Sequence, residues 1–77
     1  MRLKLTWKVY NRDIDIMVNS EQTISETIKI LSDKGFLDFM LDKDFQFVKS
    51  YRNQRNINIK LTYEDGMIYS GDILEIV

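Results

Sequence analysis

The segment between residues 23 and 35 constrains the fold most, because it carries a complete set of signals for one α-helix. Thr23 and Glu26 have the spacing of a capping box, in which the Thr23 hydroxyl accepts from the Glu26 N–H and the Glu26 carboxylate accepts from the Thr23 N–H. Gly35 is placed to end the helix in the left-handed conformation, with Phe36 just beyond it for an apolar contact. Apolar residues recur at helical spacing on one side, namely Ile24, Ile28 and Leu31, with Ile30 widening the stripe. Such a helix needs a sheet to cover.

Two alternating stretches precede the helix and predict a β-hairpin. Between residues 2 and 10, apolar side chains occupy every second position: Leu3, Leu5, Trp7 and Val9. After a polar interruption at residues 11–13, the alternation resumes with Ile14, Ile16 and Val18. Lys4 and Lys8 fall on the opposite side of the first strand, where we interpret them as solvated surface rather than as an anion site.

Residues 36–45 are unusually apolar for a connection. Phe36, Phe39 and Met40 have helical spacing and predict a short helical turn, which we interpret as a lid over the open end of a thin core rather than as an exposed patch for a partner. Asp42 and Asp44 alternate like the start of a calcium loop. Neither Gly at the sixth loop position nor Glu at the twelfth follows them, so we reject a calcium site.

The second half of the chain predicts three further strands. For the first, residues 45–51, the inward face is open, because Phe45 and Phe47 favour the odd positions and Val48 the even ones. A polar turn at residues 52–56, with two arginines that we interpret as exposed, leads to a short strand marked by Ile57, Ile59 and Leu61. The last strand follows two Gly-containing turn signals and directs two apolar residues to one face, Leu74 and Ile76.

The expected fold class is therefore α+β: a mixed sheet of four to five strands with one helix on one face and water on the other. A chain of 77 residues forms one domain, residues 1–77, with a thin core, since folding at this size buries only about 60% of the extended surface.

Composition excludes several classes of function. The chain has no Cys and no His, which argues against disulfides, thiol catalysis, zinc, iron–sulfur clusters and the commonest general base. We therefore expect no catalytic residue, no metal and no cofactor. Lys and Arg number 11 against 12 Asp and Glu, so no global field favours nucleic acid or an anionic membrane. We expect no membrane insertion and no N-terminal signal, because no long apolar run is present, and hence a cytoplasmic protein.

The element order and the ending Ile68-Tyr69-Ser70-Gly71-Asp72-Ile73-Leu74-Glu75-Ile76-Val77 resemble the ubiquitin-like β-grasp fold over essentially the whole chain. The family that the ending and the apolar first strand resemble is that of the YukD/EsaB-like ubiquitin-like proteins, associated with type VII secretion in Gram-positive bacteria. The resemblance implies a small cytoplasmic accessory or regulatory protein of the secretion machinery. It also implies no conjugation or sulfur transfer, since Ile76-Val77 replaces the Gly-Gly tail of covalent modifiers.

We therefore expect a non-enzymatic module whose partners are proteins, with components of the secretion machinery or a weak homodimer as candidates. The alternative is a stand-alone β-grasp adaptor of another assembly; an enzyme or a nucleic-acid binder is disfavoured. Because the apolar faces must turn toward the helix, their neighbours line the helix-free face, where Met17 and Ile73 lack cover. The residues expected to bind a protein are Lys4, Thr6, Lys8, Met17, Ile73 and Glu75, with Tyr51 beside them if the third strand points it outward.

Overall fold

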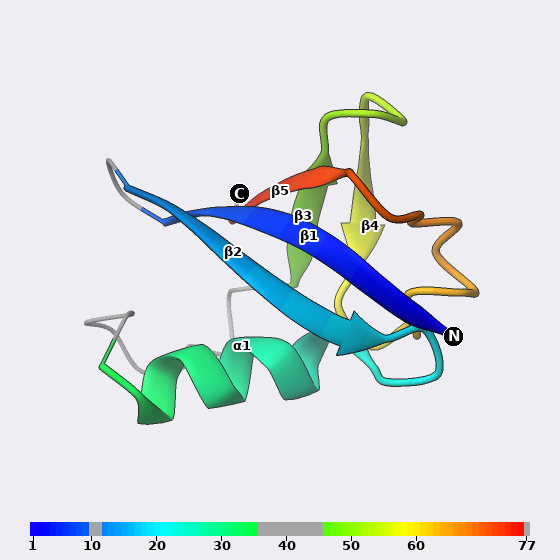
Figure 1. Cartoon of the computed structure of the whole chain (residues 1–77). Helices are drawn as coiled ribbons and strands as arrows, with labels where there is room; N and C mark the ends of the chain where they lie inside the picture. The colour runs from blue at the N-terminus through cyan, green and yellow to red at the C-terminus, as the bar shows by residue number, and fades with distance from the viewer. Residues whose placement is uncertain (10–11, 36–45, 77) are drawn as a thin grey trace.

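The computed structural model describes residues 1–9, 12–35 and 46–76, and it has the predicted element order (Figure 1). Strands β1 and β2 span Arg2–Val9 and Arg12–Asn19, and helix α1 spans Ile24–Asp33. The second half contributes three four-residue strands: β3 at Phe47–Ser50, β4 at Arg55–Asn58 and β5 at Ile73–Ile76.

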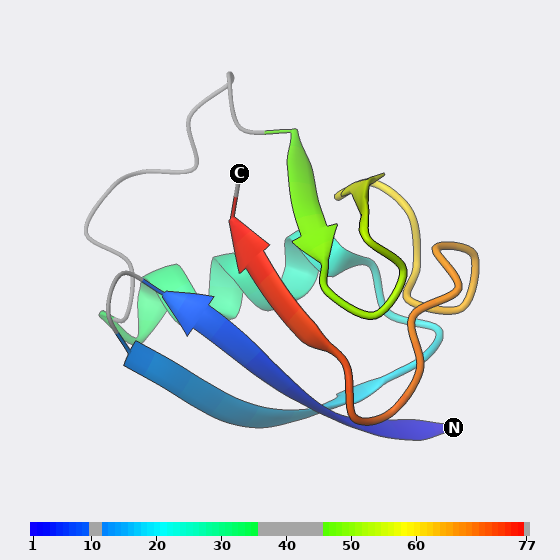
Figure 2. The same cartoon turned by 90° about the horizontal axis from the view of Figure 1, so that it is seen from above.

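The strands form one five-stranded mixed sheet in the order β2-β1-β5-β3-β4. β1 is antiparallel to β2 and parallel to β5, while β3 is antiparallel to both β5 and β4. The first and last strands of the chain therefore lie side by side in the middle of the sheet (Figure 2). Helix α1 runs across one face and leaves the other uncovered (Figure 1), so the predicted α+β arrangement is confirmed.

β1 supplies the centre of the core, because its odd-numbered side chains all face the helix. These are the four predicted from the alternation, Leu3, Leu5, Trp7 and Val9, and all are buried. On β2, Val18 is buried but Ile14 and Ile16 are only half-buried, because this strand lies at the edge of the sheet. Each large apolar side chain that is fully buried contributes about 1.5–3 kcal/mol, so this side of the sheet dominates stability.

Helix α1 begins and ends where the sequence predicts. The N–H of Glu26 donates to the Thr23 hydroxyl at 3.3 Å, and Gly35 follows the helix with a φ of +83°. The predicted stripe of Ile24, Ile28 and Leu31 is buried against the sheet, in one cluster with Leu5 and Trp7 and with Ile16 packed at its margin. The prediction that Ile30 widens the stripe is wrong: its side chain is 46% exposed, because it lies on the flank of the helix beside the edge strand.

Tyr63 joins the connection after β4 to the helix. Its side chain is fully buried, and its hydroxyl donates to Thr27 Oγ1 at 2.6 Å. Burial raises the pKa of Tyr63 well above 10.0; the Thr27 contact and the nearby indole N–H of Trp7 offset part of that rise, although no hydrogen bond of ordinary geometry joins Trp7 to Tyr63. The apolar face of α1 therefore includes one polar residue, Thr27, which the periodicity does not reveal.

The open question about the third strand is answered by the structure. Val48 and Ser50 face the core, while Phe47 and Lys49 face away from it. The choice follows from the neighbouring strand, because Val48 lies opposite Ile76 and Ser50 opposite Leu74. A slip of one residue would bury Lys49 and expose Val48.

The predicted bounds of the fourth strand are wrong. β4 starts at Arg55, within the segment expected to be a turn, and only Ile57 of the three predicted apolar positions is buried. Gln54 takes a φ of +53° and reverses the chain early, so Arg55 already pairs with Ser50. Ile59 and Leu61 lie beyond the strand, and Leu61 is 40% exposed.

The lid and the helical turn predicted for residues 36–45, and with them Asp42 and Asp44, lie outside the described residues. Within the described ranges, no helix has the length and hydropathy needed to cross a membrane.

Candidate protein-binding face

We call the helix-free side of the sheet the open face. All seven residues expected to bind a protein are on it, because they occupy the even positions of β1 and the odd positions of β2 and β5, with Tyr51 just after β3. Lys4 lies opposite Met17, and Thr6 lies between Asp15 and Ile73. A further row of side chains that lie opposite one another runs across four strands: Asp13, Lys8, Glu75 and Lys49.

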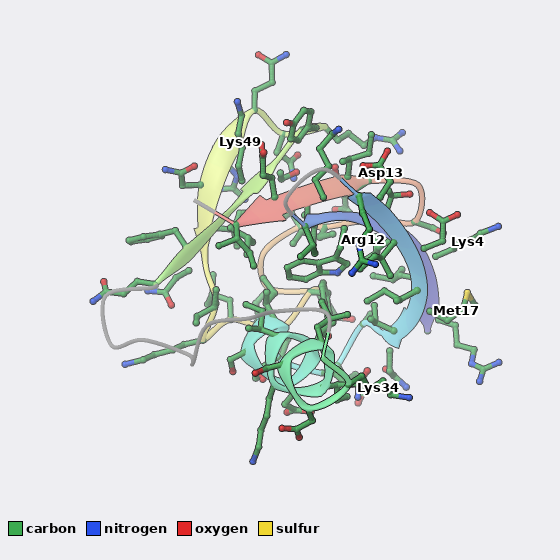
Figure 3. The ribbon with its side chains drawn as sticks, turned by 90° about the vertical axis from the view of Figure 1, so that its left-hand side faces the viewer. Lys4, Arg12, Asp13, Met17, Lys34 and Lys49 are labelled. Carbon is green, nitrogen blue, oxygen red and sulfur yellow. The ribbon has the colours of Figure 1, made fainter. Side chains whose placement is uncertain are left out.

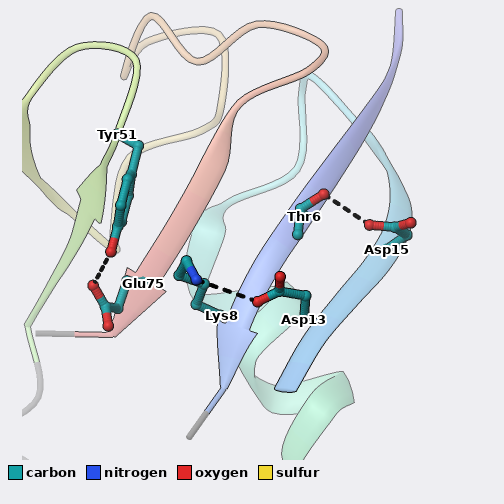
Figure 4. Close-up of polar contacts among 6 residues, drawn as sticks. All are labelled: Thr6, Lys8, Asp13, Asp15, Tyr51 and Glu75. Atoms are coloured by element: carbon teal, nitrogen blue, oxygen red, sulfur yellow. Dashed lines mark hydrogen bonds and ion pairs between the residues drawn. The ribbon is translucent and has the colours of Figure 1, made fainter. Parts of the chain in front are cut away.

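Three polar pairs connect neighbouring strands on this face (Figure 4). The hydroxyl of Thr6 donates to Asp15 Oδ1 at 2.7 Å, and Lys8 Nζ lies 3.5 Å from Asp13 Oδ1. The hydroxyl of Tyr51 donates to Glu75 Oε1 at 2.6 Å. Pairs as exposed as Lys8 and Asp13 stabilise little, about 0–1 kcal/mol, but together they fix the side chains that a partner would meet.

Tyr51 connects the end of β3 to β5 by its hydrogen bond to Glu75. Its hydrogen bond to Glu75 raises the pKa of the phenol, and the charges of Glu75 and Asp13 act in the same direction. Lys49 Nζ lies 5.2 Å from the centre of the Tyr51 ring, within the range of a cation–π contact. At neutral pH the neutral phenol therefore lies between an ammonium and a carboxylate.

The structure does not bring Met17 and Ile73 together. They lie on the two strands that flank β1, about 10 Å apart across the strands and in different rows, since Met17 is opposite Lys4 and Ile73 is opposite Thr6. Ile73 and Tyr51 line a shallow depression of about 340 Å³ together with Arg52. Met17, 56% exposed, instead borders the edge of the sheet, where Figure 3 shows it beside Lys4. The apolar groups of the open face thus form two separate positions.

The sequence analysis missed four residues of this face. Asp13 and Asp15 alternate with Ile14 and Ile16, so the parity of β2 could have identified them. Phe47 and Lys49 could not be assigned, because their strand carries apolar side chains at both parities. Their placement required the pairing of β3 with β5.

The Gly71-Asp72 turn holds the depression in place. Gly71 has a φ of +93°, and its N–H donates to the Lys4 carbonyl at 2.8 Å. Asp72 is buried; it accepts from the Ser50 hydroxyl, from the Arg52 N–H at 3.0 Å and from the Ile73 N–H at 2.7 Å. These contacts fasten the start of β5 to the end of β3. The Gly-Asp pair of the C-terminal ending therefore has a structural role in this chain.

The acidic groups of the open face are each engaged with a hydroxyl or an ammonium group rather than with one another. Asp13 and Asp15 contact Lys8 and Thr6, and Glu75 accepts from Tyr51. Within residues 1–9, 12–35 and 46–76, no three acidic side chains gather as metal ligands would. What the arrangement offers is a fixed pattern of charges and two apolar positions, which suits recognition of a complementary surface.

No protein-family model matches the chain, and no curated protein matches it in sequence. Several solved structures share its fold. The C-terminal ubiquitin-like domain of mouse tubulin-specific chaperone e matches with a TM-score of 0.70 at 14% identity, covering 97% of this chain and 84% of that one. The chain thus has the ubiquitin-like β-grasp fold.

The second structure comes from a bacterium. It is the ubiquitin-like domain of the Mycobacterium tuberculosis type VII secretion system protein ECCD1, with a TM-score of 0.66 and 13% identity. The match covers 100% of this chain and 98% of that domain. At such identities the likeness establishes the fold, and function is argued separately.

Proposed function

We propose that this chain is a non-enzymatic, cytoplasmic protein-binding module of a bacterial type VII secretion system, related to the YukD/EsaB-like proteins of Gram-positive bacteria. The observation that carries the proposal is the open face, which α1 does not cover and where side chains of β1, β2 and β5 and the Tyr51 side chain are held in fixed pairs. A ubiquitin-like domain of the same extent in a secretion protein supports the choice of system.

The proposed contact surface is centred on the depression beside β5. Tyr51 and Ile73 supply the apolar contact, while Lys4, Lys8 and Glu75 supply charges at its rim. Small apolar centres with polar rims are typical of modest protein–protein interfaces.

Pull-down from the native host tests the proposal. The double variant Tyr51→Thr/Ile73→Thr removes the apolar contact but keeps a residue compatible with β-structure at both positions. Its matched control is Leu61→Thr/Tyr69→Thr, which changes one aliphatic and one phenolic residue at exposed positions outside the open face. We expect the parent and the control to recover a membrane component of the secretion system and the open-face variant to lose it. Equal recovery by both variants would contradict the proposed surface.

A second candidate is an adaptor module of an unrelated assembly. The ubiquitin-like domain of the tubulin-specific chaperone, which matches this chain with the higher TM-score, favours it. The same pull-down separates the two candidates, because an adaptor would recover components of another complex through the same face.

That the chain is not a covalent modifier also stays a prediction. With an N-terminal tag in its native host it should run as one species on a denaturing gel. A ladder of heavier bands that survives boiling and reductant would refute it.

A further inference from the structure

A second surface, separate from the depression around Ile73, lies along the outer edge of β2. This strand has eight residues and pairs only with β1 among the described strands. The Ser20 N–H donates to the Met1 carbonyl at 2.7 Å, which makes Met1 and Ser20 a hydrogen-bonded pair of the antiparallel ladder. Since such pairs alternate, Ile14, Ile16 and Val18 also exchange their hydrogen bonds with β1.

The residues between them direct their backbone groups away from the sheet. Asp13, Asp15 and Met17 each present an N–H and a C=O at the edge. At Asn19 the pattern ends, because its N–H donates to Gln22 Oε1 and its carbonyl accepts from the Gln22 N–H, both at 2.9 Å. The edge therefore offers a template of about five residues for another strand, and no strand of the described part of the chain covers it.

An apolar groove lies directly below this template, between β2 and α1. It has a volume of about 460 Å³, and its walls include Ile14 and Ile16 from the strand and Ile30 and Leu31 from the helix. Ile30 is the residue that departs from the predicted helix stripe, and its exposure is explained by its place in this groove. Figure 3 looks along α1 and places Lys34 at the end of the helix, below the strand that carries Asp13 and Met17. Lys34 also lines the groove.

Edge and groove together fit an extended strand. Main-chain hydrogen bonds to the odd residues of β2 would hold it, and its alternate side chains would enter the groove. The other side chains would lie on the open-face side, directly beside Asp13 and Asp15; the Asp13 side chain is 62% exposed. Opposite charges at such neighbouring positions are favourable, so this side of the occupant carries Lys or Arg.

A second copy of the chain fits the same edge poorly. The symmetric antiparallel register that engages Asp13, Asp15 and Met17 together places Asp15 directly against Asp15 of the other copy. Like charges directly opposite each other destabilise a strand pair, and inward or edge charges are a common device against self-association.

We propose that the β2 edge binds an extended segment of a partner protein as an additional, antiparallel strand. Its aliphatic side chains alternate with Lys or Arg: the aliphatic ones pack toward Ile16 and Ile30, and the basic ones lie beside Asp13 and Asp15. This surface is separate from the depression around Ile73, so the two proposals stand or fall independently.

The test uses a capped seven-residue peptide that alternates lysine and valine, titrated into the isotope-labelled chain and followed by amide NMR. In the antiparallel pairing the lysines lie directly opposite Asp13, Asp15 and Met17, so the backbone N–H groups of the lysines make the hydrogen bonds. We expect the amides of these three residues to shift. Methylation of the backbone nitrogens of the lysines should weaken binding at least tenfold. Methylation of the backbone nitrogens of the valines should change binding less than twofold, because the backbone N–H groups of the valines point to solvent.

Two further comparisons separate this mode from nonspecific attraction. A peptide of the same composition with lysines and valines in blocks should bind at least tenfold more weakly. Ile30→Asp should weaken binding by a similar factor, while Met67→Asp, at an exposed apolar position far along the chain, should not. Equal binding by the two N-methylated peptides, shifts confined to Lys4 and Ile73, or an edge-paired dimer that the peptide fails to displace would overturn the proposal.

Discussion

Asp72 is the residue whose replacement tests most directly how the open face is held together. Its buried carboxylate accepts from the Ser50 hydroxyl, the Arg52 N–H and the Ile73 N–H. Asp72→Ala leaves all of these donors without their acceptor. A hydrogen bond to a charged group contributes about 1.5–3 kcal/mol, but Arg52 lies at the surface, where water replaces part of the loss. We expect the free energy of unfolding to fall by about 3–5 kcal/mol.

Asp72→Asn is the milder change. The amide oxygen can still accept from the two backbone N–H groups, while the new NH2 group faces Ser50, whose oxygen already accepts from the Asn53 N–H at 3.1 Å. We expect a loss of about 1–2 kcal/mol for this variant. The difference between the two variants in the loss of unfolding free energy therefore reports how many of the three hydrogen bonds each variant keeps.

Urea denaturation followed by tryptophan fluorescence measures both losses, since Trp7 is the only tryptophan and is fully buried. Small domains have total stabilities of about 5–15 kcal/mol, so Asp72→Ala should also lower the melting temperature by roughly 10 °C or more. Asp65→Ala, at an exposed aspartate in a nearby turn, is the matched control. If Asp72→Ala moved the midpoint no further than this control, the carboxylate would not fasten β5 to β3, and the reasoning would be refuted.

Three further predictions concern the helix, a buried phenol and a turn. Ile28→Ala should cost about 2–5 kcal/mol, because its side chain is fully buried against the sheet; a midpoint change no larger than that of Lys29→Ala would contradict the helix docking. Burial raises the pKa of Tyr63 above 10.0, so the stability that the neutral phenol contributes is fully present below pH 10 and falls at higher pH, where the unfolded chain loses this proton first. Tyr63→Phe should therefore reduce the decrease of the denaturation midpoint with rising pH. An unchanged pH dependence would argue against the raised pKa. Gln54→Gly should raise stability by about 0.5–1 kcal/mol, since a φ of +53° strains a side chain that glycine lacks; a lower midpoint would show that the Gln54 side chain itself contributes.

The sequence predicts those elements in which local pattern and tertiary environment agree. β1 alternates without exception, and the structure buries all its odd positions, because the helix covers one face and water the other. Helix α1 likewise has its N-cap at Thr23 and its left-handed glycine at Gly35, as predicted. In both elements a single face decides the burial, so periodicity is sufficient.

Prediction from the sequence fails where a partner strand or a buried polar group determines which residues are buried or where a strand begins. Ser50 can be buried because its hydroxyl donates a hydrogen bond to the Asp72 carboxylate, and no hydrophobic pattern marks such a serine. Arg55 starts a strand because Gln54 reverses the chain early, although neither residue favours β-structure. Ile30 looks like a core residue from its spacing but lies on the flank of the helix beside the edge strand.

The candidate face shows the same division. Parity alone placed six of the seven residues on the helix-free side, whereas the position of Tyr51 and the pairs Thr6–Asp15 and Tyr51–Glu75 depend on strand register and on the order of the strands. The separation of Met17 from Ile73 also follows from that order, because β1 lies between their strands. Without the strand order, the sequence alone does not show which residues of a sheet face are in contact and which only lie on the same face.

The central position of β5 has a consequence for how the chain is made. β5 is the last strand, and it connects the β1–β2 hairpin to the β3–β4 hairpin, which share no direct pairing. During synthesis the two hairpins therefore emerge as separate units, and the sheet closes only after residues 73–76 have left the ribosome. Contacts between the first and last strands span almost the whole chain, which slows folding relative to a helical protein of equal length. Until then, β1 exposes the backbone edge that β5 will occupy, which makes this interval the one in which the nascent chain is most open to wrong pairing.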